Sequence, residues 1–268
     1  MQQELSELRL KQNKLVIFIL VTTLSLIALL SYFFVDKPVL GWLYEHPQKW
    51  HKNIFVNGLE QFGKAWVIIW LLLLWAYVFR RLQLSINVLL TLLLVALAVC
   101  PLKVLIHRPR PNESVEIAHQ LQANVNNNWF ERDMQSFPSG DAASAFAATV
   151  ALAPFISLSW LIVLLAVSTA VGLLRIVGMA HYPSDVLAGT AIGILCASVV
   201  LEIISKCQNC RDFKAEQYRS IVAAALILIP VIAAVFIGMD QFLIFMVTSC
   251  PLAAGFYIAS KFRRNDSL

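Results

Sequence analysis

Three groups of polar residues interrupt a sequence that is otherwise strongly apolar. They are KVLIHRPRP (residues 103–111), FPSGDAAS (137–144) and RIVGMAHYPSD (175–185). Ionisable side chains at membrane depth cost free energy, so in an apolar chain they indicate a functional site. Together the groups hold lysine, arginine, serine, histidine and aspartate, which are side chains suited to binding a phosphate group and attacking it.

The cationic residues predict an anion site. Lys103, Arg110 and Arg175 provide three positive charges, and the two guanidinium groups can form paired hydrogen bonds to phosphate oxygens. Ser139 and Gly140 stand at the expected N-terminus of a helix, where unpaired backbone N–H groups and the helix dipole favour anions. Gly140 would let the backbone approach a ligand closely, and Ser139 would add a hydroxyl donor.

His181 and Asp185 predict the catalytic step. They are four residues apart with a proline between them, so both can lie on one face at the start of a helix. A carboxylate beside an imidazole fixes its tautomer and raises its basicity, as a nucleophilic or proton-transferring histidine requires. Phosphoryl transfer is the chemistry that this combination indicates. No cluster of carboxylates or cysteines in the sequence calls for a metal, and we expect neither a metal nor another cofactor.

Each group also has a simpler explanation when it is taken alone. Lys103 or Arg108 could be an interfacial residue whose charged end reaches the lipid headgroups. Asp185 could be a helix N-cap, and Pro109 and Pro111 could merely end a helix. None of these explanations predicts that all three groups lie together on one side of a membrane.

The elements that would carry these residues are membrane helices. Of the 268 residues, 59% are hydrophobic and only 14% are charged, whereas soluble domains carry about a quarter charged residues. A membrane span needs roughly 20 mostly apolar residues. Eight segments qualify, at about 15–34, 66–80, 86–106, 140–156, 159–178, 186–204, 220–238 and 241–260. We therefore expect an all-α, polytopic membrane helical bundle that forms a single membrane domain over residues 1–268.

The segment between the first two spans, about 36–65, mixes aromatic and charged residues. Rings with one polar edge are favoured at the level of the lipid headgroups, so this segment suits the membrane interface. An ordinary exposed loop is the alternative.

The distribution of basic residues predicts the orientation. If the N-terminus is cytoplasmic, twelve Lys and Arg residues fall on the cytoplasmic side and nine on the other, and five of those nine lie in or near the polar groups. Both termini then face the cytoplasm, and all three polar groups face the opposite side. Compact loops and an outward site favour a bacterial inner membrane with a periplasmic site, with the endoplasmic reticulum as the alternative. No basic stripe is interleaved with aromatic residues, so we expect no nucleic-acid partner.

In these residues the chain resembles the type 2 phosphatidic acid phosphatase superfamily of integral membrane lipid phosphatases. The first and third motifs of that family are Lys-x6-Arg-Pro and Arg-x5-His-x3-Asp. They are matched in order and spacing by Lys103, Arg110, Pro111, Arg175, His181 and Asp185. The second motif, Pro-Ser-Gly-His, is matched at 138–140, but Asp141 stands where the family has histidine. The resemblance covers roughly residues 86–204.

The resemblance implies a six-helix phosphatase core over about 15–204. The remaining two apolar segments are then additional transmembrane helices over about 219–260. It also implies a histidine mechanism, in which His181 attacks phosphorus to form a phosphohistidine and Asp185 orients it. Water would then hydrolyse the intermediate without a required metal. The residues that would hold the phosphate oxygens are Lys103, Arg110, Arg175, Ser139 and the backbone amide of Gly140.

Asp141 bears on the choice of substrate, because the family's second-motif histidine protonates the leaving group. An aspartate is ordinarily ionised at neutral pH, so it is a poor acid and would repel a bound phosphate. A lipid pyrophosphate needs an acid least, because its leaving group is itself an acidic phosphate. This favours a diphosphate such as undecaprenyl pyrophosphate, with phosphatidic acid and phosphatidylglycerophosphate as the alternative substrates. Other interpretations are that His107 or His119 supplies the acid, that Asp141 stays protonated beside the substrate, or that Asp141 only caps the fourth helix.

The sequence thus predicts a metal-independent integral membrane enzyme that hydrolyses a lipid phosphate or pyrophosphate in the bilayer. One alternative is a phosphotransferase that passes the phosphate from His181 to another lipid headgroup. The other is a non-catalytic member of the family that binds lipid.

Overall fold

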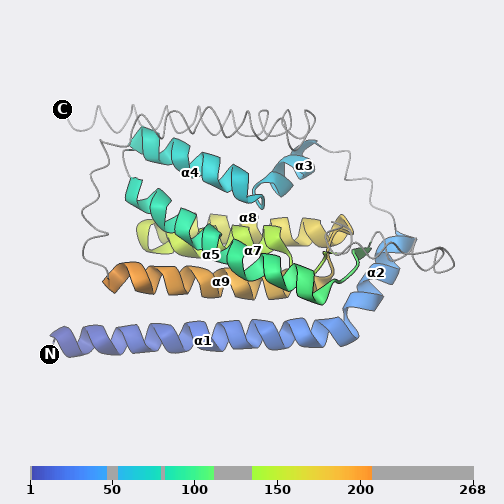
Figure 1. Cartoon of the computed structure of the whole chain (residues 1–268), viewed down its shortest axis with the longest axis horizontal. Coiled ribbons are helices and arrows are strands. Elements are labelled where there is room, and N and C mark those ends of the chain that lie inside the picture. The colour runs from blue at the N-terminus through green and yellow to red at the C-terminus, as the bar shows by residue number, and fades with distance from the viewer. Residues whose placement is uncertain (1, 47–53, 80–81, 112–134, 207–268) are drawn as a thin grey trace.

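The computed structural model describes residues 2–46, 54–79, 82–111 and 135–206, and all regular elements in these ranges are helical (Figure 1). The elements are α1 (Gln2–Phe34), α2 (Asp36–Glu45), α3 (Ile54–Gln61), α4 (Ala65–Phe79), α5 (Leu82–Ile106), α7 (Gly140–Leu152), a 3₁₀ turn (Ala153–Phe155), α8 (Leu158–Val177) and α9 (Pro183–Lys206). The predicted all-α architecture is therefore confirmed for the described part of the chain.

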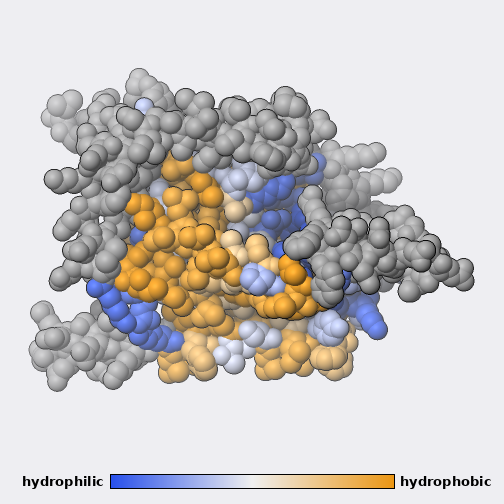
Figure 2. Space-filling model, in the orientation of Figure 1, coloured by the Kyte–Doolittle hydropathy of each residue, from blue (hydrophilic) through white to orange (hydrophobic). Residues whose placement is uncertain are grey.

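Four stretches of helix in the described ranges are long and apolar enough to cross a membrane. They are Lys14–Phe34, Leu84–Ile106, Leu158–Val177 and Pro183–Lys206, and two shorter apolar stretches are Ala65–Trp75 and Gly140–Phe155. Figure 2 shows apolar side chains gathered over the middle of the bundle and hydrophilic ones towards its ends, as a membrane protein requires. These six stretches correspond to the first six predicted spans. The last two predicted spans, at about 220–238 and 241–260, lie outside the described residues.

Helix α7 lies at the centre of the bundle and packs against α4, α5, α8 and α9, while α1 packs on the outer side of α9 (Figure 1). Small side chains allow this central position. Ala143 and Ala147 of α7 are fully buried and pack with Val95 and Val99 of α5 and Cys196 of α9. Because methyl groups occupy little space, neighbouring helices approach α7 closely.

The contact between α7 and α9 is so close that it admits no side chain at two positions. A Cβ atom at Gly189 would lie 2.3 Å from the carbonyl oxygen of Ser139, and one at Gly193 would lie 2.3 Å from that of Ala143. The two glycines form a Gly-x3-Gly pattern, which lets helix backbones touch in membranes. This contact, which we call the α7–α9 seam, fixes the start of α7 beside the start of α9.

Two shorter helices, α2 and α3, lie at the end of the bundle where α5 ends and α9 begins (Figure 1). Leu40 and Leu43 of α2 form a buried cluster with Tyr182. After α3, a Cβ atom at Gly63 would lie only 3.0 Å from the Cβ of Asp141. The segment predicted as interfacial or as a loop therefore contains two helices that pack on the end of the bundle.

Candidate active site

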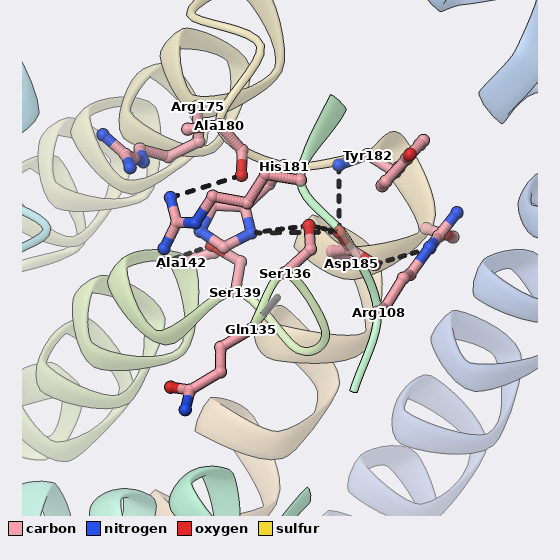
Figure 3. A network of polar contacts seen from close by, with 12 residues as sticks. Arg108, Gln135, Ser136, Ser139, Ala142, Arg175, Ala180, His181, Tyr182 and Asp185 are labelled. Carbon is pink, nitrogen blue, oxygen red and sulfur yellow. Dashed lines mark hydrogen bonds and ion pairs between the residues drawn. The ribbon is translucent and has the colours of Figure 1, made fainter. Parts of the chain in front are cut away.

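The three polar groups of the sequence meet at one end of the bundle, where α5 and α8 end and α7 and α9 begin (Figure 3). The structure places Lys103 in the last turn of α5, Arg175 in the last turn of α8, Ser139 at the N-cap of α7, His181 in the α8–α9 turn and Asp185 in the first turn of α9. The count of predicted spans placed all three groups on one side of the membrane, and the structure brings these residues together at adjoining helix ends.

The turn between α8 and α9 places the histidine. The backbone N–H groups of Ala180 and His181 both donate to the carbonyl oxygen of Arg175, each at 3.1 Å. Met179 adopts a left-handed conformation with φ of 51°, which reverses the chain after the last turn of α8. Pro183 then opens α9, a position where its missing N–H is no loss. His181 is thereby held directly beside the end of the helix that carries Arg175.

Ser139 joins the start of α7 to the start of α9. Its backbone N–H donates to the carbonyl oxygen of Asp185 at 3.0 Å, and its Oγ accepts from the N–H of Ala142 at 3.4 Å. The capping bond uses a lone pair of the hydroxyl oxygen, so the O–H remains a donor for a ligand. A Cβ atom at Gly140 would meet only Val99 and Lys103, at 3.8 and 3.9 Å. Protein packing therefore does not require glycine at this position, which is consistent with a backbone approached by a ligand.

The histidine contacts the aspartate partly through a serine. Nδ1 of His181 lies 3.8 Å from Oδ2 of Asp185 and 3.5 Å from Oγ of Ser136, and Ser136 donates to the same carboxylate oxygen at 2.5 Å (Figure 3). The N–H of Tyr182 donates to this oxygen as well, at 3.0 Å. Ser136 is fully buried and was missed by the sequence analysis, because it belongs to no motif. The carboxylate is thus held from two sides next to the imidazole.

His181 is buried beside several positive charges. Burial, together with the charges of Arg175, Arg110 and Lys103, lowers the pKa of His181 to about 4, while the carboxylate of Asp185 opposes the shift. The imidazole is therefore neutral at pH 7 and has a lone pair available for attack. The same interactions indicate that the three cations among the predicted phosphate ligands lie near the ring.

Two of these cations are also bound to backbone carbonyl groups. Nζ of Lys103 donates to the carbonyl oxygen of Gln135 at 2.6 Å, and Nη1 of Arg110 donates to that of Ala180 at 3.4 Å. A lysine has three N–H groups and an arginine has five, so each side chain can be held in place and still bind an anion.

Asp141, the residue that departs from the family motif, contacts the third cation. Its Oδ2 lies 3.2 Å from Nε of Arg175, and Glu60 of α3 lies 3.6 Å from Nη1 of the same side chain. The N-cap of α7 is Ser139, so the interpretation that Asp141 merely caps this helix is wrong. Glu60 was missed because α3 lies far from the motifs in the sequence.

Arg108 binds two carboxylates. It donates to Asp185 at 2.6 Å and to Asp36 of α2 at 2.8 Å. The simple explanation in which Arg108 reaches the lipid headgroups is therefore wrong. Asp185 lies inside the first turn of α9 with these partners, so it is also more than a helix N-cap.

The structure says little about the two candidate auxiliary acids, His107 and His119. His107 follows directly after α5 with φ of 48°, and His119 lies outside the described residues. A role for either as an acid stays a prediction. Among the described residues, no group of three or more His, Cys, Asp or Glu side chains is arranged to hold a metal ion.

Comparison with known proteins agrees with the motif analysis. Residues 84–209 match the PAP2 superfamily, which confirms the resemblance drawn from the three motifs. Among solved structures, the crystal structure of Aquifex aeolicus LpxE is similar, with a TM-score of 0.50 and 24% sequence identity. The similarity covers 63% of this chain and 95% of that one, and at this identity it shows a shared fold. Curated proteins give no match.

Proposed function

We propose that this chain, which matches the PAP2 superfamily over residues 84–209, is an integral membrane lipid phosphatase acting through a covalent phosphohistidine. One observation carries the proposal. A neutral, buried His181 lies between a carboxylate and three cations at one end of an apolar helical bundle.

In the first chemical step, His181 acts as the nucleophile. Its Nδ1 faces Ser136 and Asp185, so Nε2 is the nitrogen that reaches the substrate. The lone pair of Nε2 forms a bond to phosphorus while the bond to the lipid oxygen breaks, and that oxygen leaves with the electron pair. The positive charge that develops on the ring is stabilised by Asp185. Water then cleaves the P–N bond, releasing inorganic phosphate and a proton and restoring the imidazole.

The cationic residues stabilise the negative charge of the phosphoryl group in both steps. Lys103, Arg110 and Arg175 would bind its oxygens, with the hydroxyl of Ser139 and the N–H of Gly140 at the start of α7. Donors held in place by the helix ends need little rearrangement when the substrate binds.

The residue at position 141 favours a pyrophosphate substrate. Asp141 contacts Arg175, and this carboxylate stands where an acid for the leaving group would stand in the family motif. A lipid phosphate leaves from a pyrophosphate without such an acid, so undecaprenyl pyrophosphate is the favoured substrate. Phosphatidic acid and phosphatidylglycerophosphate, which are monoesters, are the alternatives. We place the site on the periplasmic side of a bacterial inner membrane, with both termini cytoplasmic.

The test is release of inorganic phosphate by the purified protein, with a chelator present, from each of these three lipids. Wild type is compared with His181→Ala, Asp141→His and a matched control, His46→Ala, at the exposed end of α2. We expect wild type and the control to release phosphate from the pyrophosphate, and His181→Ala to release none. Asp141→His should gain activity on the monoesters.

Each other outcome changes the proposal in a defined way. If wild type cleaves monoesters best, the leaving-group argument is wrong and Asp141 or a loop histidine serves as the acid. Transfer of phosphate to a second lipid without release would identify a phosphotransferase. No reaction with any lipid would support a non-catalytic lipid-binding member.

A further inference from the structure

A row of buried charges leads from α2 to the catalytic pair. Nη1 of Arg108 donates to Oδ1 of Asp185 at 2.6 Å, and Nη2 donates to Oδ2 of Asp36 at 2.8 Å. The side chains of the two aspartates are 0 and 2% exposed. One guanidinium group thus joins two carboxylates that are 149 positions apart (185 − 36).

The carboxylate of Asp36 is bound by Arg108 and also by two serines from other parts of the chain. It accepts from Oγ of Ser31 in α1 at 3.2 Å and from the backbone N–H of Ser184 at 3.0 Å, as well as from the hydroxyl of Ser184. The N–H of Ser184 is one of the first amides of α9 and has no partner within its own helix. Asp36 therefore satisfies the start of the helix that carries Asp185, in addition to binding Arg108.

Aromatic rings fix the plane of the guanidinium group. Cζ of Arg108 lies 3.6 Å from the centroid of the Tyr182 ring and 4.9 Å from that of Tyr32. Because the fork of an arginine is planar, holding its plane also fixes the directions of both hydrogen-bonding pairs. The orientation of Asp185 is in this way set from α1 and α2, outside the segment that matches the family.

We propose that Asp36 and Arg108 are positioning residues for the reaction, which act on His181 through Asp185; this rests on the phosphatase function proposed above. Arg108 occupies Oδ1 of Asp185, so that Oδ2 is directed to Ser136 and His181. The set of Asp36, Arg108 and Asp185 carries one net negative charge.

The charge balance explains why Asp36 is needed. Arg108 alone would neutralise Asp185 and weaken its stabilisation of the positive ring that forms when His181 is phosphorylated. With Asp36 on its other side, Arg108 fixes the geometry of Asp185 while the cluster keeps a negative charge next to the histidine. The phosphate ligands are separate side chains, so loss of Asp36 should slow the chemistry without weakening phosphate binding.

The experiment measures kcat, KM and inhibition by inorganic phosphate for the full chain, with the lipid that wild type hydrolyses. The variants are Asp36→Asn, Asp36→Glu, Arg108→Lys and the double variant Asp36→Asn/Arg108→Gln. The control is Glu202→Gln, which removes an exposed carboxylate paired with Lys14. We expect kcat to fall about tenfold to a hundredfold in Asp36→Asn and in the double variant, with KM and the inhibition constant of phosphate unchanged.

The conservative variants add a second criterion. Asp36→Glu keeps the charge and should recover part of the lost kcat. Arg108→Lys keeps the charge but not the planar fork, so it cannot hold both carboxylates in the same directions and should stay slow. Asp36→Asn keeps the buried ion pair between Arg108 and Asp185, so this variant should fold. The double variant leaves Asp185 charged but without the guanidinium group that orients it, so it tests the loss of geometry apart from the loss of charge. If the double variant fails to fold, Arg108→Lys, which keeps a cation beside Asp185, is the deciding variant.

Two results would overturn the inference. One is a kcat in the double variant within twofold of wild type. The other is a loss of phosphate inhibition in parallel with kcat, which would show a general structural role. The phosphatase proposal fails separately, if wild type releases no phosphate or His181→Ala still releases it.

Discussion

Arg108 and Arg175 each lie between two carboxylates, but the two clusters are closed to different degrees. The inner cluster consists of Arg108, Asp36 and Asp185, and the outer cluster consists of Arg175, Asp141 and Glu60. The ion-pair distances are 2.6 and 2.8 Å in the inner cluster and 3.2 and 3.6 Å in the outer one. The arginines are almost equally exposed, at 14 and 13%, whereas the carboxylates are 0 and 2% exposed in the inner cluster and 27 and 18% in the outer.

The difference in burial shows how an arginine between two carboxylates can serve as a structural support in one place and as a binding group in another. A buried charge whose partner is removed is strongly destabilising, while an exposed ion pair contributes little. If phosphate binds Arg175 as proposed, it should replace the carboxylates there with little loss of stability, whereas it should not replace those at Arg108. We therefore interpret the inner cluster as a fixed support and the outer cluster as the one that exchanges ligands with substrate.

The largest expected effect is on stability and comes from the inner cluster. Arg108→Gln leaves Asp36 and Asp185 buried without a cation, so the free energy of unfolding should fall by about 3–5 kcal/mol. Arg175→Gln should lower it by less than about 1 kcal/mol, because its carboxylates reach solvent. Chemical denaturation of both variants in detergent is the measurement. Equal losses would contradict the distinction between the two clusters.

The next effect is on activity and comes from the outer cluster. Arg175→Gln should reduce kcat/KM by about a hundredfold, because it removes a donor to the phosphoryl oxygens. Arg175→Lys should recover only part of the loss, since a lysine cannot form the paired bonds of a guanidinium group. Steady-state kinetics on the wild-type substrate tests this. Full activity of Arg175→Gln would remove this residue from the phosphate site.

Asp141→Asn should strengthen the binding of phosphate. This effect is smaller than the loss expected for Arg175→Gln and opposite in direction. The change removes a carboxylate that competes with phosphate for Arg175, so inorganic phosphate should inhibit about threefold more strongly. The inhibition constant is compared with that of wild type at low ionic strength. Weaker inhibition would instead mean that Asp141 holds Arg175 in its binding position.

The smallest effect is expected for Glu60→Gln. The distance from Glu60 to Arg175 is 3.6 Å, against 3.2 Å for Asp141, so its competition with phosphate is weaker. Inhibition by phosphate should strengthen by less than about twofold. The same inhibition assay measures this change. A larger effect than that of Asp141→Asn would show that the distance to Arg175 does not determine how strongly each carboxylate competes with phosphate.

The membrane helices could be predicted because length and composition alone identify them. The run at about 86–106 is observed as α5, and the run at about 159–178 as α8, each to within a few residues. Helix ends were less predictable. The first helix begins at Gln2 instead of about 15, because no glycine or proline interrupts the polar start of that segment. The α7 run ends at Leu152 in a 3₁₀ turn, since Pro154 cannot donate the next helical bond.

The candidate site was predictable where motif residues stand at helix ends. Lys103 and Arg175 stand near the ends of long apolar runs and His181 stands between two of them, so their approach at one end could be inferred from the number of spans. The roles of Asp36 and Ser136 could not be predicted from the sequence, because their partners lie far away in the chain and no local periodicity marks such pairs. For Asp36 there was one usable signal, a single carboxylate directly after a long apolar run.

The α7–α9 seam has a consequence for motion. Its glycines bring two backbones into direct contact, so we expect the helix that presents Ser139 and the helix that carries Asp185 to move together. Opening the site by separating these helices would break the contact between Ser139 and Asp185 that aligns their ends. On the side of α3, by contrast, the contacts of Arg175 with Asp141 and Glu60 are ion pairs of 3.2 and 3.6 Å, so a ligand that displaces them would leave the seam intact.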